Sequence, residues 1–193
     1  MKVLMMNGSR REKGCTYTAL TIIGEVLKEE GIDWEIVQLG KDSVNGNLNQ
    51  LVETLKEKCQ EADAFVFGSP VYYASPSGEI QLVLDRLFSC AGDQLRWKPA
   101  AVVTSARRAG TTSALEVLSK YPSFHEMPLV TSNCWTMVHG QSPEDVRKDE
   151  EGVAVMQVLG RNMAWILKSI EAGKKAGVKQ PEKTLRPSTN FIR

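Results

Sequence analysis

The sequence has little of what marks several large classes of protein. Its 193 residues contain no apolar run near the roughly 20 residues that a membrane-spanning helix needs. Two histidines and four scattered cysteines, with no C-x-x-C pair, favour neither a zinc site nor an iron–sulfur cluster. Lysine and arginine total 24 against 23 acidic residues, so no face is expected to attract nucleic acid or an anionic membrane. These absences favour a soluble cytoplasmic protein with reduced thiols.

Short apolar segments alternate with segments of helical periodicity. We expect strands at 2–6, 33–39, 64–67, 100–104 and 127–131, and helices at 16–30, 47–61, 77–89, 112–120 and over a long segment that starts with a cap at 142. This alternation predicts one doubly wound α/β domain with a parallel sheet and helices on both faces. The domain is expected to span residues 1–172, with a loosely attached tail at 173–193.

The loop after the first expected strand combines glycines, hydroxyls and cations ahead of a helix. It reads Asn7-Gly8-Ser9-Arg10-Arg11-Glu12-Lys13-Gly14-Cys15-Thr16. Backbone N–H groups and the helix dipole at such a place suit a phosphate. The spacing of Gly8 and Gly14 is not that of a Walker A loop, and Cys15 occupies the place of its lysine, so a single terminal phosphate is favoured over a triphosphate. The alternative is a solvated basic turn that caps the helix.

Ligands of open α/β sheets bind beyond the carboxyl ends of the strands, so the loops after the third and fourth strands are also candidates. The first of these presents Tyr72 and Tyr73 as flat surfaces for a ligand. One of the two is expected to pack on the domain instead, because neighbours in an extended segment point opposite ways. The other loop carries Arg107 and Arg108, which form either part of a site or a solvated face.

Taken together, these loops resemble the NADPH-dependent FMN reductase and iron–sulfur flavoprotein group of flavodoxin-like proteins. The matching elements are Gly8-Ser9, Arg11, Gly14 and Thr16, then Gly68-Ser69-Pro70-Val71-Tyr72-Tyr73, Leu84-Asp85-Arg86, Ser105 to Gly110, and Trp135 to Gly140. The resemblance covers about residues 1–172 and implies a flavodoxin-like, five-stranded sheet in the order 2-1-3-4-5. Arg10 stands where the group has proline, and Cys15 where it commonly has asparagine. The cluster cysteines of the iron–sulfur branch are absent, so that electron route is not expected.

The resemblance implies bound FMN and assigns its contacts to the loops. The phosphate is expected on Ser9, Arg11, Gly14, Cys15 and Thr16, the ring against Pro70, Val71, Tyr72 and Tyr73, and the pyrimidine edge near Ser105, Arg107 and Gly110. Arg107 or Arg108 is expected to stabilise the reduced, anionic flavin. No catalytic side chain and no metal are expected, because the flavin carries the chemistry.

The implied activity is an oxidoreductase that takes electrons from NAD(P)H through FMN to a small acceptor, such as a quinone, a flavin, or an azo or nitro compound. Two alternatives stay open: a flavin-binding carrier or redox sensor without NAD(P)H turnover, and a nucleotide-binding scaffold without flavin. The resemblance also implies a homodimer or homotetramer. Trp135 and His139 would border a subunit contact, unless Trp135 packs in the core.

Overall fold

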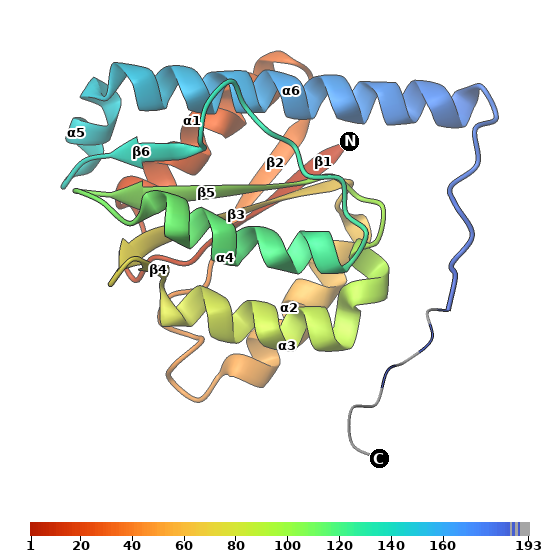
Figure 1. Ribbon diagram of the computed structural model, residues 1–193, viewed down its shortest axis with the longest axis horizontal. Coiled ribbons are helices and arrows are strands. Elements are labelled where there is room, and N and C mark those ends of the chain that lie inside the picture. The colour runs from red at the N-terminus through yellow and green to blue at the C-terminus, as the bar shows by residue number, and fades with distance from the viewer. Residues whose placement is uncertain (186, 188, 190–193) are drawn as a thin grey trace.

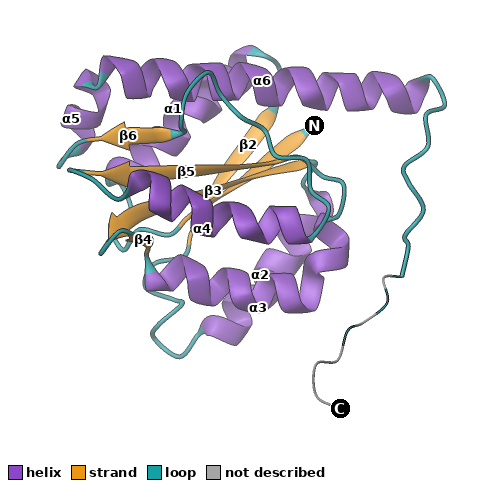
Figure 2. Ribbon diagram, in the orientation of Figure 1, coloured by secondary structure: helices purple, strands orange, loops and turns teal. Residues whose placement is uncertain are grey.

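The fold is one parallel sheet between two layers of helices, seen in a computed structural model that describes residues 1–185, 187 and 189 (Figure 1). The strands are β1 (Lys2–Asn7), β2 (Asp33–Gln38), β3 (Ala64–Tyr72), β4 (Ser75–Pro76), β5 (Ala100–Ala106) and β6 (Met137–His139). The helices are α1 (Cys15–Glu29), α2 (Leu48–Glu61), α3 (Gly78–Leu95), α4 (Thr111–Phe124), α5 (Pro143–Lys148) and α6 (Glu150–Lys175). Figure 2 shows the strands in the middle layer.

Within the described residues, the parallel strands follow the order β2-β1-β3-β5-β6, and β4 pairs antiparallel with the end of β3. This is the predicted order of five parallel strands, with the small β4 added. Buried side chains of β1, β3 and β5 alternate between two clusters. One cluster packs on α1 and α6, and the other packs on α2 and α3 with part of α4. The sheet is therefore covered on both faces, which explains its nearly continuous apolar strands.

The prediction of the fifth strand at Met127–Thr131 is wrong. That segment makes one isolated bridge, between Leu129 and Ala100 at the start of β5. Pro128 has no N–H to donate to a ladder, and its carbonyl only accepts from Ala100 N at 2.9 Å. The chain then leaves the sheet and returns as β6, which pairs with the carboxyl end of β5.

Several element boundaries also differ from the prediction. β3 continues through the expected loop to Tyr72, because Gly68–Pro70 still pair with β5. The long last helix is two helices, α5 and α6, because Asp149 has a non-helical ψ of 82° between them. Its carboxylate accepts a bond from Gly152 N at 3.0 Å and so caps α6. α6 ends at Lys175. The predicted boundary between a domain and a tail at residue 172 stays a prediction, and part of that tail lies outside the described residues.

Searched over the described residues, the structure contains no helix with the length and apolar character to cross a bilayer. The same part of the chain holds no group of three or more histidine, cysteine, aspartate or glutamate side chains placed to bind a metal ion.

Candidate cofactor site

A cavity of about 220 Å³ lies at the carboxyl ends of β1, β3 and β5, where the three candidate loops meet. Its walls come from the loop after β1, the end of β3, the end of β5 and the segment after β6. The lining residues are Ser9, Arg11, Cys15, Thr16, Pro70, Val71, Tyr72, Ser105, Ala106, Arg107, Gly140 and Gln141. Most of the predicted cofactor residues are therefore brought together from segments that lie far apart in the sequence.

The loop after β1 is tightly folded at its start. Gly8 N donates to Gly68 O at 2.8 Å, which ties the loop to the neighbouring strand β3. Ser9 N donates to Asn7 Oδ1 at 3.1 Å, and Ser9 Oγ accepts from Arg11 N at 3.1 Å. A side-chain Cβ at position 8 would lie 2.6 Å from Ile80 Cβ, so the close approach of loop and helix requires glycine.

α1 begins beside the cavity without an acidic cap. Its N-cap residue is Gly14, and the turn Cys15–Thr18 contains no aspartate or glutamate. The first amides of a helix have no partners within the helix, and the helix dipole gives that end a partial positive charge. By contrast, Ser142 and Asp149 cap α5 and α6 with their side chains. The start of α1 is therefore suited to an external anion such as a phosphate.

Two buried hydroxyls connect the start of α1 to the end of β5 across the cavity. Thr16 Oγ1 and Ser105 Oγ lie 2.7 Å apart, and the residues are 1% and 4% exposed. One hydroxyl donates to the other, so the donating hydroxyl can still accept, and the accepting hydroxyl keeps its own proton to donate to a ligand. This contact links the start of α1 to the end of β5, which fixes the width of the cavity at its base.

The wall formed by the end of β3 finishes in a tight hairpin between β3 and β4. Tyr73 and Ala74 at its tip have φ values of 51° and 59°, in the left-handed region that non-glycine residues rarely adopt. Tyr72 lines the cavity and is half exposed, whereas Tyr73 is fully exposed. The expectation that one of these tyrosines packs on the domain is wrong, because Tyr72 faces the cavity and Tyr73, at the hairpin tip, is fully exposed. Gly110 supports the hairpin, since a Cβ there would lie 2.8 Å from Ala74 Cα.

Charged and sulfur-containing groups complete the cavity. The exposed side chains of Arg11 and Arg107 line it, while Arg108, the other candidate of the pair, is absent from its lining. Cys15 Sγ lies 3.5 Å from Gly140 O. Burial raises the pKa of the Cys15 thiol, so this group stays neutral near neutral pH and does not repel an anion.

Three predicted residues lie outside the lining, and three lining residues were missed. Gly14, Tyr73 and Gly110 shape the neighbouring turns instead of facing the cavity. Sequence reasoning missed Ala106, Gly140 and Gln141. Gln141 follows β6, which the sequence did not place in the sheet. The match of residues 135–140 to the family pattern was the one signal that pointed to this region.

The two residues considered for a subunit contact lie elsewhere. Trp135 is 68% exposed, so it is not a core residue at the end of a strand. It lines a separate surface cavity beside α4. His139 is exposed, and its Nδ1 lies 3.9 Å from Asp149 Oδ2 at the start of α6.

A second, larger cavity lies elsewhere on the protein. It measures about 790 Å³ and lies between α3 and α4, with Phe88, Val117 and Tyr121 among its walls. Tyr121 Oη donates to Asp85 Oδ1 there at 2.5 Å. This larger cavity lies away from the strand ends, and no glycine-rich loop is among its walls to approach a phosphate. The chemistry of the walls therefore makes the smaller cavity, at the strand ends, the candidate cofactor site.

The fold and the cavity define a flavodoxin-like protein with a site suited to a mononucleotide. The match to solved structures agrees on the fold. A WrbA-like flavodoxin from Agrobacterium tumefaciens superposes with a TM-score of 0.65 over 87% of this chain and 97% of that chain, at 14% identity. A protein described as a flavone reductase superposes with a TM-score of 0.69 over 89% of this chain and 64% of its own, at 19% identity.

The chain belongs to the NADPH-dependent FMN reductase family, whose model matches residues 1–142. An iron–sulfur flavoprotein of Methanocaldococcus jannaschii is 27% identical over 89% of this chain and all of its own. An FMN-dependent NADPH-azoreductase of Staphylococcus saprophyticus is 31% identical over 53% of this chain and 59% of its own. Membership of this family makes the protein an oxidoreductase with FMN as cofactor and NADPH as co-substrate.

Proposed function

We propose that the enzyme passes electrons from a nicotinamide nucleotide, through FMN held in the 220 Å³ cavity, to a small acceptor such as a quinone, a flavin, or an azo or nitro compound. The observation that supports this most is the meeting of an anion-binding helix start with a tyrosine-lined hairpin in one cavity. Related proteins described as an azoreductase and a quinone oxidoreductase support the class of acceptor. FMN supplies hydride and electron transfer when it is bound.

The phosphate end of the cofactor is assigned to the base of the cavity. Ser9, Thr16 and the first amides of α1 offer hydrogen-bond donors there, and Arg11 offers a positive charge. The neutral thiol of Cys15 lies beside these groups without adding negative charge. Together these donors and the positive charge match the oxygens and the negative charge of a phosphate.

The ring end is assigned to the hairpin side of the cavity. Pro70, Val71 and Tyr72 form an apolar and aromatic wall, and Ser105 and Arg107 come from the facing strand end. The exposed Tyr73 and Gly110 complete the rim as parts of the hairpin and its support. Arg107 places a positive charge where reduction adds negative charge to a bound flavin, and this charge favours the reduced form.

The proposal is tested with the absorbance spectrum of the purified protein with FMN, before and after anaerobic addition of NADPH. We expect a bound-flavin spectrum that bleaches on mixing, followed by recovery when a quinone or an azo dye is added. A flavin spectrum that NADPH does not bleach would instead indicate an electron carrier or a sensor. A protein that FMN cannot colour would leave only a nucleotide-binding scaffold.

Residue assignment is tested separately from activity. Thr16→Val should weaken FMN binding about tenfold or more, because a hydrogen bond to a charged group is lost. Riboflavin, which has no phosphate, should bind this variant nearly as well as it binds the wild type. Ser89→Ala, at an exposed position on α3 away from the cavity, is the matched control.

Two further parts of the proposal concern the location and the assembly of the protein. We place the enzyme in the cytoplasm, where its four free thiols stay reduced. We also propose a homodimer or homotetramer of this chain as the working assembly. Cell fractionation tests the first, and analytical ultracentrifugation of the FMN-loaded protein tests the second.

A further inference from the structure

One buried carboxylate has no part in the proposed function so far. Glu79 lies in the first turn of α3 and is 4% exposed. Ser77 Oγ, at the N-cap, accepts from Ile80 N and so meets the usual capping need of this helix without Glu79. A charged side chain buried to this degree needs a partner, because an isolated carboxylate in such a place is strongly unfavourable.

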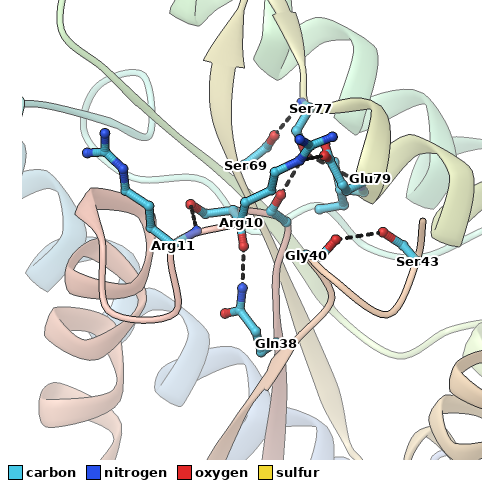
Figure 3. Close-up of polar contacts among 11 residues, drawn as sticks. Arg10, Arg11, Gln38, Gly40, Ser43, Ser69, Ser77 and Glu79 are labelled. Atoms are coloured by element: carbon cyan, nitrogen blue, oxygen red, sulfur yellow. Dashed lines mark hydrogen bonds and ion pairs between the residues drawn. The ribbon is translucent and has the colours of Figure 1, made fainter. Parts of the chain in front are cut away.

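The partner of Glu79 is Arg10, in the loop after β1. Arg10 Nε donates to Glu79 Oε1, and the two residues are separated by 69 positions in the chain. Figure 3 shows the Arg10 side chain extending away from its loop to meet Glu79, while Arg11 points to the other side. The ion pair therefore connects the proposed phosphate loop to the N-terminus of α3.

The same stretch of loop is held from β2 as well. Gln38 Nε2 donates to Ser9 O, and Gln38 Oε1 accepts from Asn7 Nδ2 at 2.6 Å. Gly40 lies directly under the loop, since a Cβ there would lie 2.5 Å from Ser9 O and 2.8 Å from Arg10 Cα. The backbone at positions 9 and 10 is thus fixed between β2 on one side and α3 on the other.

We propose that Glu79 is a positioning residue for FMN: through Arg10 it holds the loop from Gly8 to Gly14 in the shape that receives the phosphate. This proposal rests on the placement of the phosphate given above. A loop already ordered before binding loses less conformational entropy when the ligand arrives, so the ion pair strengthens binding without touching FMN. Arg10 also neutralises a buried negative charge that would otherwise repel the phosphate.

Positioning and simple charge effects predict opposite results for one substitution. Glu79→Gln removes a negative charge near an anion site, so electrostatics alone would strengthen FMN binding. Loss of the ion pair frees Arg10 and its loop, so a positioning role for Glu79 predicts that FMN binds more weakly. The expected loss of affinity is about tenfold, which is the usual strength of a hydrogen bond between charged groups. The direction of the change therefore decides between the two.

The experiment uses the full chain loaded with FMN, diluted in steps while the fluorescence of released FMN is recorded. We expect Glu79→Gln and Arg10→Gln each to raise the dissociation constant of FMN about tenfold, and the double variant to raise it no further, because both remove one interaction. Riboflavin binding should stay within about twofold of wild type, because riboflavin makes no phosphate contact. Glu61→Gln is the control, since Glu61 pairs with Lys2 far from the loop.

A second measurement separates positioning from loss of the fold. In Glu79→Gln, amide hydrogen exchange should become faster in residues 8–14 and stay unchanged in α6. Unchanged or tighter FMN binding in Glu79→Gln would overturn the proposal, and so would equal weakening of FMN and riboflavin. If Thr16→Val weakens FMN binding and Glu79→Gln does not, the positioning role fails while the phosphate site stands. If neither variant changes FMN binding, the site assignment itself is wrong.

Discussion

Replacement of Gly40 by alanine places one methyl group beneath the proposed phosphate loop. The new Cβ would lie 2.5 Å from Ser9 O and 2.8 Å from Arg10 Cα, and both of these are backbone atoms. Real Cβ atoms essentially never approach closer than 3.0 Å, so the loop must move by at least about 0.5 Å. Gln38 and Glu79 hold the loop in place, so the movement strains both attachments.

The expected size of this effect follows from the cost of overpacking. Inserting a methyl group into a closely packed region costs about 1–3 kcal/mol of folding free energy. Displacement of the loop from its binding shape should also weaken FMN binding by about tenfold, which corresponds to about 1.4 kcal/mol. Loss of stability and loss of affinity are therefore expected together in Gly40→Ala.

Gly78 provides the matched control for this substitution. It begins α3 near the same loop, but a Cβ there has no atom within 4 Å. Gly78→Ala should leave FMN binding unchanged and should be neutral or stabilising by up to about 1 kcal/mol, because alanine favours the helix. Urea denaturation of the flavin-free proteins and FMN dissociation on dilution measure both quantities. If Gly40→Ala matches Gly78→Ala in both, the close packing under the loop has no functional consequence.

Three further predictions concern the site and the sheet edge. Thr16→Val and Ser105→Ala should each lower the free energy of unfolding by about 1–2 kcal/mol. The double variant should lose less than the sum of the two, because the hydroxyls are hydrogen-bonded to each other at 2.7 Å, and additive losses in urea denaturation would contradict this. Arg107→Ala should lower the midpoint potential of bound flavin by about 5–20 mV, the equivalent of about 0.2–1 kcal/mol for an exposed charge in a two-electron couple. Arg108→Ala should leave the potential unchanged in the same redox titration, and equal shifts in both variants would remove the distinction between them. The hydrogen bond from Lys58, together with Lys2, lowers the pKa of Glu35 in the folded protein, so its contribution to stability is present at neutral pH and is lost as the pH falls through that lowered pKa. Glu35→Gln should therefore cost less than about 1 kcal/mol at pH 7, and this cost should shrink steadily in urea denaturations carried out at successively lower pH.

Sequence reasoning located the elements best where local pattern and tertiary role agree. The apolar runs of β1 and β3 are buried on both faces, so their composition alone marks central parallel strands. The prediction of a strand failed at Met127–Thr131, where an apolar run contains Pro128 and pairs with β5 at a single bridge. Apolar character predicts burial, whereas pairing depends on the register that neighbouring strands impose.

In the candidate site, too, local sequence features could be predicted and contacts set by the tertiary structure could not. Its loops could be found because glycines, hydroxyls and arginines follow strands at the end where ligands bind. Which of two neighbouring side chains faces the cavity could not be found, because this depends on turn geometry. Tyr72 lines the cavity and Tyr73 does not, because Tyr73 and Ala74 have positive φ and form the tip of the hairpin. Arg107 and Arg108 are likewise adjacent in sequence, yet one of them is part of the lining.

The sequence by itself determined the class of fold and marked the glycine- and hydroxyl-rich loop before the first helix as a candidate phosphate site. These features are local, because they arise from periodicity, turn chemistry and the start of a helix. Tertiary structure decided that Arg10 meets Glu79, that Thr16 meets Ser105, and that the segment after β6 closes the cavity. These contacts join residues far apart in the chain, and only the packing of strands and helices brings them within hydrogen-bonding distance.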